Sequence, residues 1–225
     1  MDKVDYFLQE TQLWIRQKPL LYRFTLGIRS LLAIGFIPTG MVKLLGYRFT
    51  TMNLETPIGA FFEAMYQSGP YWRFLGITQV LAGILVLIPA TSALGAITFL
   101  GILINIFIIT ISYDFNFTPV ITFSMLLASV WLVVWDYNRF RSIIFNSESR
   151  YKSFQKASSE VKLPGQTLEN WYERSVYITG TLAGLLFFSM LRGLPLPDGS
   201  GLVLLSVGAL AFIIAIVFAL RNIQR

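Results

Sequence analysis

Long apolar segments alternate with shorter polar ones along most of the chain. Six of them, at 21–45, 72–88, 93–112, 118–135, 175–191 and 202–220, fall within or close to the roughly 17–25 residues of a helix that crosses a bilayer. Short turns after Ile88 and Ser112 make neighbouring spans antiparallel. The pattern predicts an all-α integral membrane protein, with an antiparallel four-helix transmembrane bundle at 21–135 and a C-terminal transmembrane hairpin at 175–225.

Two shorter segments have helical patterns outside these spans. Residues 1–20 carry apolar side chains near helical spacing and end at Lys18 and Pro19, which predicts an amphipathic helix in the inner membrane interface or, alternatively, an ordinary soluble helix. Farther on, Thr56 and Pro57 are typical of an N-cap and a first helical position, and the segment stops at Gly69. We expect a short lid helix there, over the outer end of the first span.

The C-terminal half leaves two questions open. Residues 136–174 form a basic, predicted cytoplasmic loop, which either docks a partner or is a solvated connector that follows the positive-inside rule. Small residues in the last two spans would allow close helix packing, either between those spans or with a second protein chain. They are Gly180, Gly184, Ala211 and Ala215.

Composition and charge agree with a membrane protein. Charged residues make up 13% of the chain and the mean hydropathy is +0.62, against about 25% charged residues in soluble domains. With the N-terminus inside, four of the 18 Lys and Arg residues lie outside (Lys43, Arg48, Arg73 and Arg192), Arg29 lies within a span, and the other thirteen lie inside. This bias predicts that both termini are cytoplasmic, and the net charge of +6 needs no nucleic acid to explain it.

The chain contains neither cysteine nor histidine. Thiol exchange, thiolate-held iron–sulfur or zinc sites, ordinary haem ligation and an imidazole base are therefore excluded for its own side chains. The sequence shows no metal site and no catalytic constellation. We therefore expect no enzymatic activity from these residues alone.

Polar residues at membrane depth are candidates for function. Arg29, Gly40 and Lys43 share one face of the first span, and Thr39 lies beside that face. The second and third spans contribute one amide each. The candidate ligand pocket consists of Arg29, Thr39, Gly40, Lys43, Gln79 and Asn105.

Charge pairing predicts different partners for the two cations. We expect Lys43 to pair with Glu63 or Asp114 and so to hold the lid on the bundle. For Arg29 three partners stay open: a helix-end carbonyl, a lipid phosphate, or Asp136. Structural roles compete with the pocket, because Lys43 would also snorkel to the interface and the two amides would bond each other. A proton or ion path is disfavoured because no acid lies well inside a span.

Two stretches carry a resemblance to a known family. "RSLLAIGFIPTGMVKLLGY" and, after the lid, "LGITQVLAGILVLIPATSALGA" resemble the DoxX-like family of small membrane proteins over about residues 22–135. The matching positions are Arg29, Gly40 and Lys43, then Gln79, Gly83 and Pro89. The resemblance implies a role beside quinol or thiosulfate:quinone oxidoreductases or in membrane assembly. Relatives often carry an acid in place of Gln79 and a histidine late in the third span, both absent here, which weakens a redox or metal role.

Two functional hypotheses follow. The first is a non-enzymatic accessory subunit or assembly factor of a membrane complex, whose partners are membrane lipids and another membrane protein or a second copy of the chain. The second is a quinone- or lipid-binding subunit of a membrane oxidoreductase, in which the quinone or bound lipid is the cofactor and carries the redox chemistry. A small-molecule transporter ranks third, since no inverted repeat is visible. We expect a bacterial inner membrane, because the resemblance is mainly to bacterial proteins.

Overall fold

The structure is a computed structural model of the 225-residue chain and describes residues 2–144, 171–193, 197 and 199–221. These residues form helices and no strand. Six helices are long and apolar enough to span a membrane: α2 (Pro19–Leu44), α4 (Pro70–Leu87), α5 (Ser92–Ser112), α6 (Thr118–Trp135), α9 (Trp171–Leu191) and α10 (Ser200–Arg221). The prediction of an all-helical protein with six candidate spans is confirmed, and these helices point to an integral membrane protein.

Three shorter helices complete the described part: α1 (Asp2–Arg16), α3 (Pro57–Gln67) and α7 (Tyr137–Ile144). The start of α3 follows the local sequence signals, because the Thr56 hydroxyl accepts a hydrogen bond from the Gly59 N–H at 3.2 Å and Pro57 takes the first helical position. Gly69 then adopts a φ of +60°, which glycine tolerates without a steric penalty. This turn sends the chain directly into α4.

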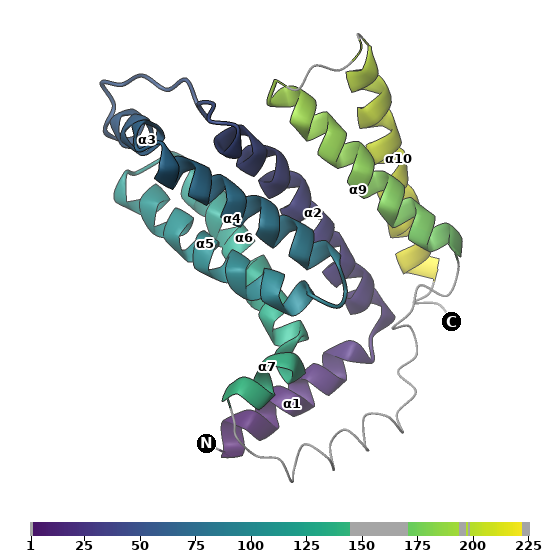
Figure 1. The fold of residues 1–225 in the computed structure, drawn as a ribbon. Helices are drawn as coiled ribbons and strands as arrows, with labels where there is room; N and C mark the ends of the chain where they lie inside the picture. The colour runs from purple at the N-terminus through teal and green to yellow at the C-terminus, as the bar shows by residue number, and fades with distance from the viewer. Residues whose placement is uncertain (1, 145–170, 194–196, 198, 222–225) are drawn as a thin grey trace.

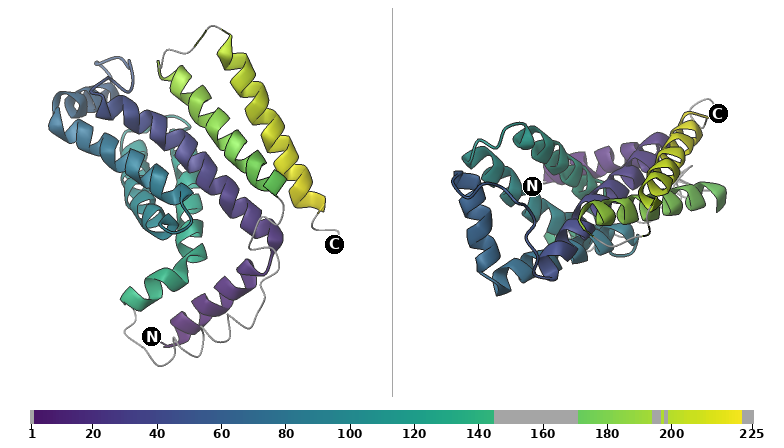
Figure 2. Two further views of the ribbon diagram at one scale, coloured as in Figure 1. Left: turned by 45° about the vertical axis from the view of Figure 1, so that its right-hand side comes forward. Right: turned by 90° about the horizontal axis from the view of Figure 1, so that it is seen from above.

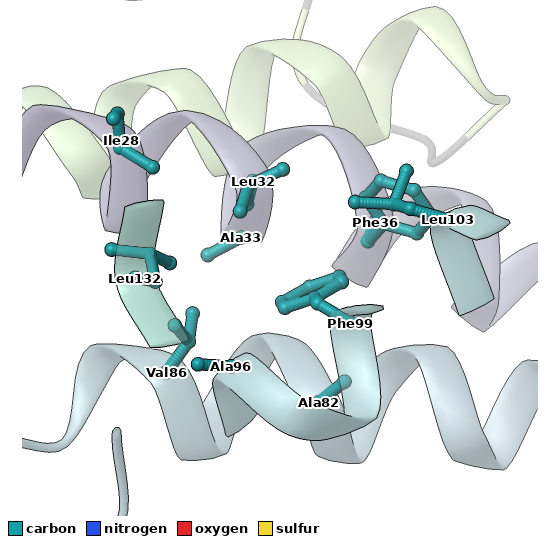
Figure 3. Close-up of a cluster of buried hydrophobic side chains, with 10 residues drawn as sticks. All are labelled: Ile28, Leu32, Ala33, Phe36, Ala82, Val86, Ala96, Phe99, Leu103 and Leu132. Atoms are coloured by element: carbon teal, nitrogen blue, oxygen red, sulfur yellow. The ribbon is translucent and has the colours of Figure 1, made fainter. Parts of the chain in front are cut away.

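Helices α2, α4, α5 and α6 pack along one another (Figure 1). All four contribute to one buried apolar cluster (Figure 3), whose members are Ile28, Leu32, Ala33, Phe36, Ala82, Val86, Ala96, Phe99, Leu103 and Leu132. At its centre the rings of Phe36 and Phe99 meet edge to face, with centroids 5.0 Å apart. Because lipid chains are as apolar as these side chains, tight packing rather than water exclusion holds such a core together.

Glycines bring α2 and α4 into close backbone contact. A Cβ added to Gly40 would lie 2.9 Å from the Gly76 carbonyl oxygen and 3.0 Å from Gln79 Cβ, and one added to Gly76 would overlap the Leu44 backbone nitrogen. Small residues permit this approach, as they do in other membrane helix pairs. The contact sets the distance between the two helices just where Lys43 and Gln79 project.

Helices α9 and α10 pack on each other and lie on the far side of α2 from α4, α5 and α6 (Figure 2). A Cβ at Gly180 would lie 3.0 Å from Ala211 Cβ on α10, whereas one at Gly184 would lie within 3.1 Å of Ile34 Cγ1 on α2. Ala211 is buried and Ala215 half-buried. The two glycines therefore serve different contacts: Gly180 faces the other helix of the pair and Gly184 faces α2.

At the opposite end from α3, α1 packs against α6 and α7 (Figure 1). Gln12 is fully buried and donates to the Trp135 carbonyl at 2.8 Å, and Ile15 is buried beside it. Within the predicted cytoplasmic loop at 136–174, residues 137–144 form α7 and residues 171–174 begin α9. The remainder of that predicted loop, residues 145–170, lies outside the described residues.

Candidate functional site

Lys43 is a buried cation at the α3 end of α2. The residue is 9% exposed, and its Nζ donates a hydrogen bond to Gln79 Oε1 at 2.9 Å. The same Nζ lies 5.0 Å from the ring centroid of Phe49 and 5.4 Å from that of Trp72. Among the described residues no carboxylate lies within ion-pair distance of it. An amide oxygen and two aromatic faces are what compensate its charge.

Hydrogen bonds to the segment after α2 fix the two aromatic rings. Trp72 is 1% exposed, and its indole N–H donates to the Tyr47 carbonyl at 2.9 Å. Arg192, just beyond α9, donates to the Phe49 carbonyl at 3.2 Å and lies 5.0 Å from the Phe49 ring centroid. Burial lowers the pKa of Arg192 from its usual value. Two cations, Lys43 and Arg192, therefore flank one aromatic ring.

A cavity of about 360 Å³ adjoins Lys43. Its lining is mostly apolar and comes chiefly from α3, α4 and α5. The polar side chains in it are those of Lys43, Thr78, Gln79, Asn105 and Thr110. The α4 residues Tyr71 and Phe74 line it and are exposed on the surface, so the cavity reaches the face of the protein that lipid chains would cover. Besides these residues, its walls include Phe49, Phe62, Met65, Trp72, Leu75, Gly101, Ile102, Ile106 and Ile109.

Asn105 lies in this wall on α5, and its side chain is exposed. The expected bond between Gln79 and Asn105 is absent, because Gln79 is already engaged by Lys43 and no hydrogen bond of the Asn105 side chain is found in the described part of the chain. A Cβ added to Gly101, one turn away, would meet nothing within 4 Å. This stretch of α5 therefore presents an unengaged amide beside open space.

The predicted pairing of Lys43 with Glu63 or Asp114 is wrong. Glu63 instead accepts two hydrogen bonds from Arg48, at 2.8 and 2.9 Å, and one from Gln67. Those bonds, the Arg48 one foremost, lower the pKa of Glu63 to about 2. Asp114 occupies a tight turn with φ +45° and is exposed. The reason is geometric: Lys43 shares the face of Gly40, which is turned toward α4, whereas Arg48 lies beyond the helix end and reaches α3 first.

Two other pocket candidates serve the helices instead. Gly40 packs against Gly76 and does not line the cavity. Thr39 turns its hydroxyl back onto its own helix and donates to the Gly35 carbonyl at 2.8 Å. That carbonyl lies beside the position that Pro38 leaves without an intrahelical donor. Of the six predicted pocket residues, three thus meet around the cavity: Lys43, Gln79 and Asn105.

Arg29 lies apart from them, at the α1 end. It is 14 residues before Lys43, about 21 Å along a helix. Its Nη2 donates to Asp136 Oδ2 at 3.0 Å, which selects Asp136 from the three partners considered, and Asp136 is 2% exposed. The Ser92 hydroxyl donates to the same oxygen at 2.8 Å. Arg16 reaches the other oxygen at 3.4 Å, and burial lowers the pKa of Arg16 even though Asp136 raises it.

Several residues of these sites carried no signal in the sequence. Arg23 and Glu173 form a buried ion pair between α2 and α9 across 150 residues, and nothing local in the sequence pairs them. Nothing in the sequence connects Trp72 with Lys43, and the fold places the Trp72 ring centroid 5.4 Å from the Lys43 Nζ. No group of three His, Cys, Asp or Glu side chains in the described residues is arranged to hold a metal ion.

Comparison with known proteins gives one informative relative. No family model matches the chain, and no solved structure matches it. The chain is 31% identical over 121 residues to the uncharacterized protein YwoB of Bacillus subtilis, an alignment that covers 51% of this chain and 78% of YwoB. The chain belongs to the same family as YwoB. Because YwoB is described as uncharacterized, the kinship shows a shared family and brings no activity with it.

Proposed function

We propose that this protein binds the polar head of an amphiphilic molecule, a quinone or a lipid, in the cavity beside Lys43. The observation that carries the proposal is the buried ammonium with no carboxylate partner among the described residues. A buried charge is costly unless it is paired and hydrogen-bonded. An ammonium has three N–H donors, and Gln79 accepts one of them. A carbonyl or anionic oxygen of a bound head group would accept another.

The shape and lining of the cavity support the same class of ligand. Its volume of about 360 Å³ falls in the range of small-molecule sites, which are mostly apolar with a few polar groups that fix orientation. Lys43 and Gln79 are such groups, and the isoleucines of α5 provide an apolar wall. Asn105 adds an amide to the same α5 wall. A quinone ring or a lipid glycerol region with an attached chain has this combination of polar head and apolar tail.

We also propose how the chain lies in the membrane. The packed helices α2, α4, α5 and α6 are a four-helix transmembrane bundle, α9 and α10 a transmembrane hairpin, α3 an outer lid, and α1 an inner interfacial helix. Both termini are cytoplasmic, in a bacterial inner membrane. The chain has no native cysteine, so a membrane-impermeant thiol reagent applied to intact cells should label Ser68→Cys and spare Gln17→Cys. The reverse labelling would invert the topology.

The DoxX-like resemblance supports the proposed ligand class, since that family takes its name from a quinol-oxidase subunit. The positions that carry the resemblance include both Lys43 and Gln79, which meet at the cavity. In this reading the protein holds the ligand head and orients it, and any redox chemistry belongs to the ligand and to a partner enzyme.

Native mass spectrometry of the protein, extracted gently from its own membrane, tests the proposal. We expect a bound small molecule at a fixed ratio in the wild type and at least a tenfold lower occupancy in Lys43→Met. Arg73→Met is the matched control, because Arg73 is an exposed cation at the same end of the bundle and lies outside the cavity wall. Equal occupancy in all three proteins would overturn the proposal.

The same spectra distinguish the other hypothesis. A second polypeptide at fixed stoichiometry, with no retained small molecule, would contradict the binding function and favour an accessory subunit or assembly factor. Gln79→Leu provides an independent check, because it removes the Lys43 acceptor without changing the charge. We expect it to lower ligand occupancy while the helical circular dichroism spectrum stays that of the wild type.

A further inference from the structure

A second cavity lies at the α1 end, between α2 and α9, and has a volume of about 590 Å³. The two helices run parallel here: Arg23 pairs with Glu173, the Thr181 hydroxyl donates to the Ser30 hydroxyl at 2.9 Å, and Gly184 packs on Ile34. These three contacts put matching levels of α2 and α9 side by side. Leu87 at the end of α4 and Pro89 in the turn after it close the cavity.

The lining of this cavity changes character along the helices. Toward the α1 end it contains Tyr22, Arg174 and Tyr177, and Arg29 lies farther along α2. Toward the middle of the helices it becomes mostly apolar, with Ile178, Leu182 and Leu185 of α9 and Leu87 of α4, and the two hydroxyls in the wall there, Ser30 and Thr181, bond each other. From Arg174 to Leu185 the chain rises about 16 Å. The cavity thus joins a basic end to an apolar end, as an amphiphile with an anionic head requires.

Arg29 has hydrogen-bonding capacity that the protein leaves unused. Its side chain is 9% exposed and donates a single hydrogen bond, to Asp136, within the part of the chain that the structure describes. Its Nε is buried without a partner. A guanidinium has five N–H donors, and Asp136 must also serve Ser92 and Arg16. An unpaired buried donor is costly, so a further acceptor at Arg29 would stabilise the site.

Phosphate is the acceptor that matches this arrangement. Arginine binds phosphate oxygens through charge-assisted, often paired hydrogen bonds, and basic pockets between membrane helices on the cytoplasmic side bind anionic lipid head groups. Among the described residues, four arginines share two carboxylates at this end: Arg16, Arg29 and Arg139 lie at Asp136, and Arg23 pairs with Glu173. Arg174 lines the cavity. The apolar half of the cavity selects a lipid over a free ion, because inorganic phosphate would use none of it.

We infer that the cavity between α2 and α9 is a binding site for an anionic phospholipid, with the phosphate at Arg29 and Arg174 and an acyl chain along Leu182 and Leu185. This site is separate from the cavity beside Lys43, and the inference does not depend on the function proposed for that cavity. A bound lipid would also join α9 and α10 to the other helices, since α9 meets them chiefly through α2.

Native mass spectrometry with phosphatidylglycerol as the probe tests this inference. Protein delipidated by detergent exchange is titrated with phosphatidylglycerol and, in parallel, with phosphatidylcholine. We expect one phosphatidylglycerol per wild-type chain, bound at least tenfold more tightly than phosphatidylcholine, and at least tenfold weaker binding in Arg29→Gln and Arg174→Gln. Lys18→Gln should bind as the wild type does, because Lys18 is an exposed cation at the same end that does not line the cavity.

Two further variants keep the result interpretable. Arg29→Gln also breaks the bond to Asp136, so Leu185→Trp, which fills the apolar half without changing charge, should reduce phosphatidylglycerol binding by a similar factor. Lys43→Met should leave phosphatidylglycerol binding unchanged, which separates this site from the other cavity. Equal losses in Lys18→Gln and Arg174→Gln would indicate a non-specific lipid annulus and overturn the inference. Displacement of the lipid by millimolar inorganic phosphate would overturn it too, in favour of a small-anion site.

Discussion

The two ends of α2 bury cations and compensate them differently: Arg23 and Arg29 lie at the α1 end, and Lys43 lies at the α3 end. At the α1 end Arg29 meets Asp136, a carboxylate that is 2% exposed and also accepts from the Ser92 hydroxyl. At the α3 end Lys43 meets the uncharged Gln79 and the rings of Phe49 and Trp72. Within the part of the chain that the structure describes, one helix of 26 residues therefore carries ion-paired arginines at one end and a cation without a counter-charge at the other.

This difference separates a cation that the fold compensates with a carboxylate from one that it compensates without any charge. A buried ion pair is built into the fold, and removing either member leaves the other uncompensated. A buried cation held by an amide and aromatic faces is compatible with the folded state but leaves donors for a ligand. The comparison teaches that the partner of a buried charge, more than its burial, indicates how much of that charge the fold itself already compensates.

The largest expected effect comes from breaking the ion pair at the α1 end. Asp136→Asn should destabilise the protein by roughly 3–5 kcal/mol, because it leaves the Arg29 guanidinium buried without its counter-charge. Arg16 contributes less, since its side chain is 24% exposed and reaches water. The measurement is the unfolding midpoint in mixed micelles of increasing denaturing-detergent fraction.

Two companions sharpen that measurement. The double variant Asp136→Asn/Arg29→Leu should regain part of the lost stability, since it no longer buries an unpaired charge. Asp114→Asn removes a carboxylate from an exposed turn at the other end and should leave the midpoint unchanged. If Asp136→Asn and Asp114→Asn shift the midpoint equally, the contrast between the two ends does not hold.

The next largest effect comes from the backbone contact that brings Lys43 to Gln79. Gly40→Ala places a methyl group 2.9 Å from the Gly76 carbonyl oxygen, and such overpacking costs about 1–3 kcal/mol. Gly35→Ala is the matched control on the same helix, because its added Cβ would meet nothing within 4 Å and alanine favours a helix by up to about 1 kcal/mol over glycine. The same unfolding assay should show opposite signs, and a common sign would contradict the close contact.

How far the sequence could predict this molecule depends on whether a feature is set by neighbouring residues or by residues distant in the sequence. The spans and the start of α3 depend on local features, such as apolar length and the Thr56-Pro57 pair. The structure has the fourth span at 118–135, as predicted, and α3 begins at Pro57. The partner of Lys43 was mispredicted because charge alone favours an acid. Lys43 lies on the helix face turned toward Gly76, where its side chain meets the amide of Gln79 instead. Spacing along α2 correctly put Arg29 and Lys43 beyond reach of a shared counter-ion.

Contacts distant in sequence were beyond prediction. Glu173 lies 150 residues from Arg23, so their pairing depends on α9 docking beside α2, which no local pattern encodes. Phe49 gave no sign of holding two cations, because its role arises from Arg192 arriving with the end of α9. Residues within one helix turn were thus predictable in part, and sites assembled from separate helices were not.

A smaller effect on stability, with a large effect on ligand, is expected at the α3 end. Lys43→Met removes a buried charge and leaves only the uncharged Gln79 oxygen without its donor, so the loss should stay near 1 kcal/mol. The unfolding midpoint should therefore move far less than in Asp136→Asn, while ligand occupancy falls at least tenfold. A Lys43→Met midpoint shift as large as that of Asp136→Asn would make Lys43 a structural residue and remove the basis for the comparison.

The smallest effect is the pH response of the ion pair between α3 and the segment after α2. Bonds from Arg48 and Gln67 lower the pKa of Glu63 from 4.5 to about 2, so the folded form favours the ionised carboxylate. Its stabilising contribution is then complete above about pH 4.5 and is lost as the pH falls toward 2. Hydrogen exchange of α3 amides, corrected for intrinsic rates, should accelerate over that window in the wild type, whereas Glu63→Gln should show no such step. A step near neutral pH would require a different titrating group.

Because Arg48 is itself an exposed partner, the effect of the Arg48–Glu63 pair should shrink in high salt. The buried pair at Asp136 should respond differently, because salt screens its contribution far less.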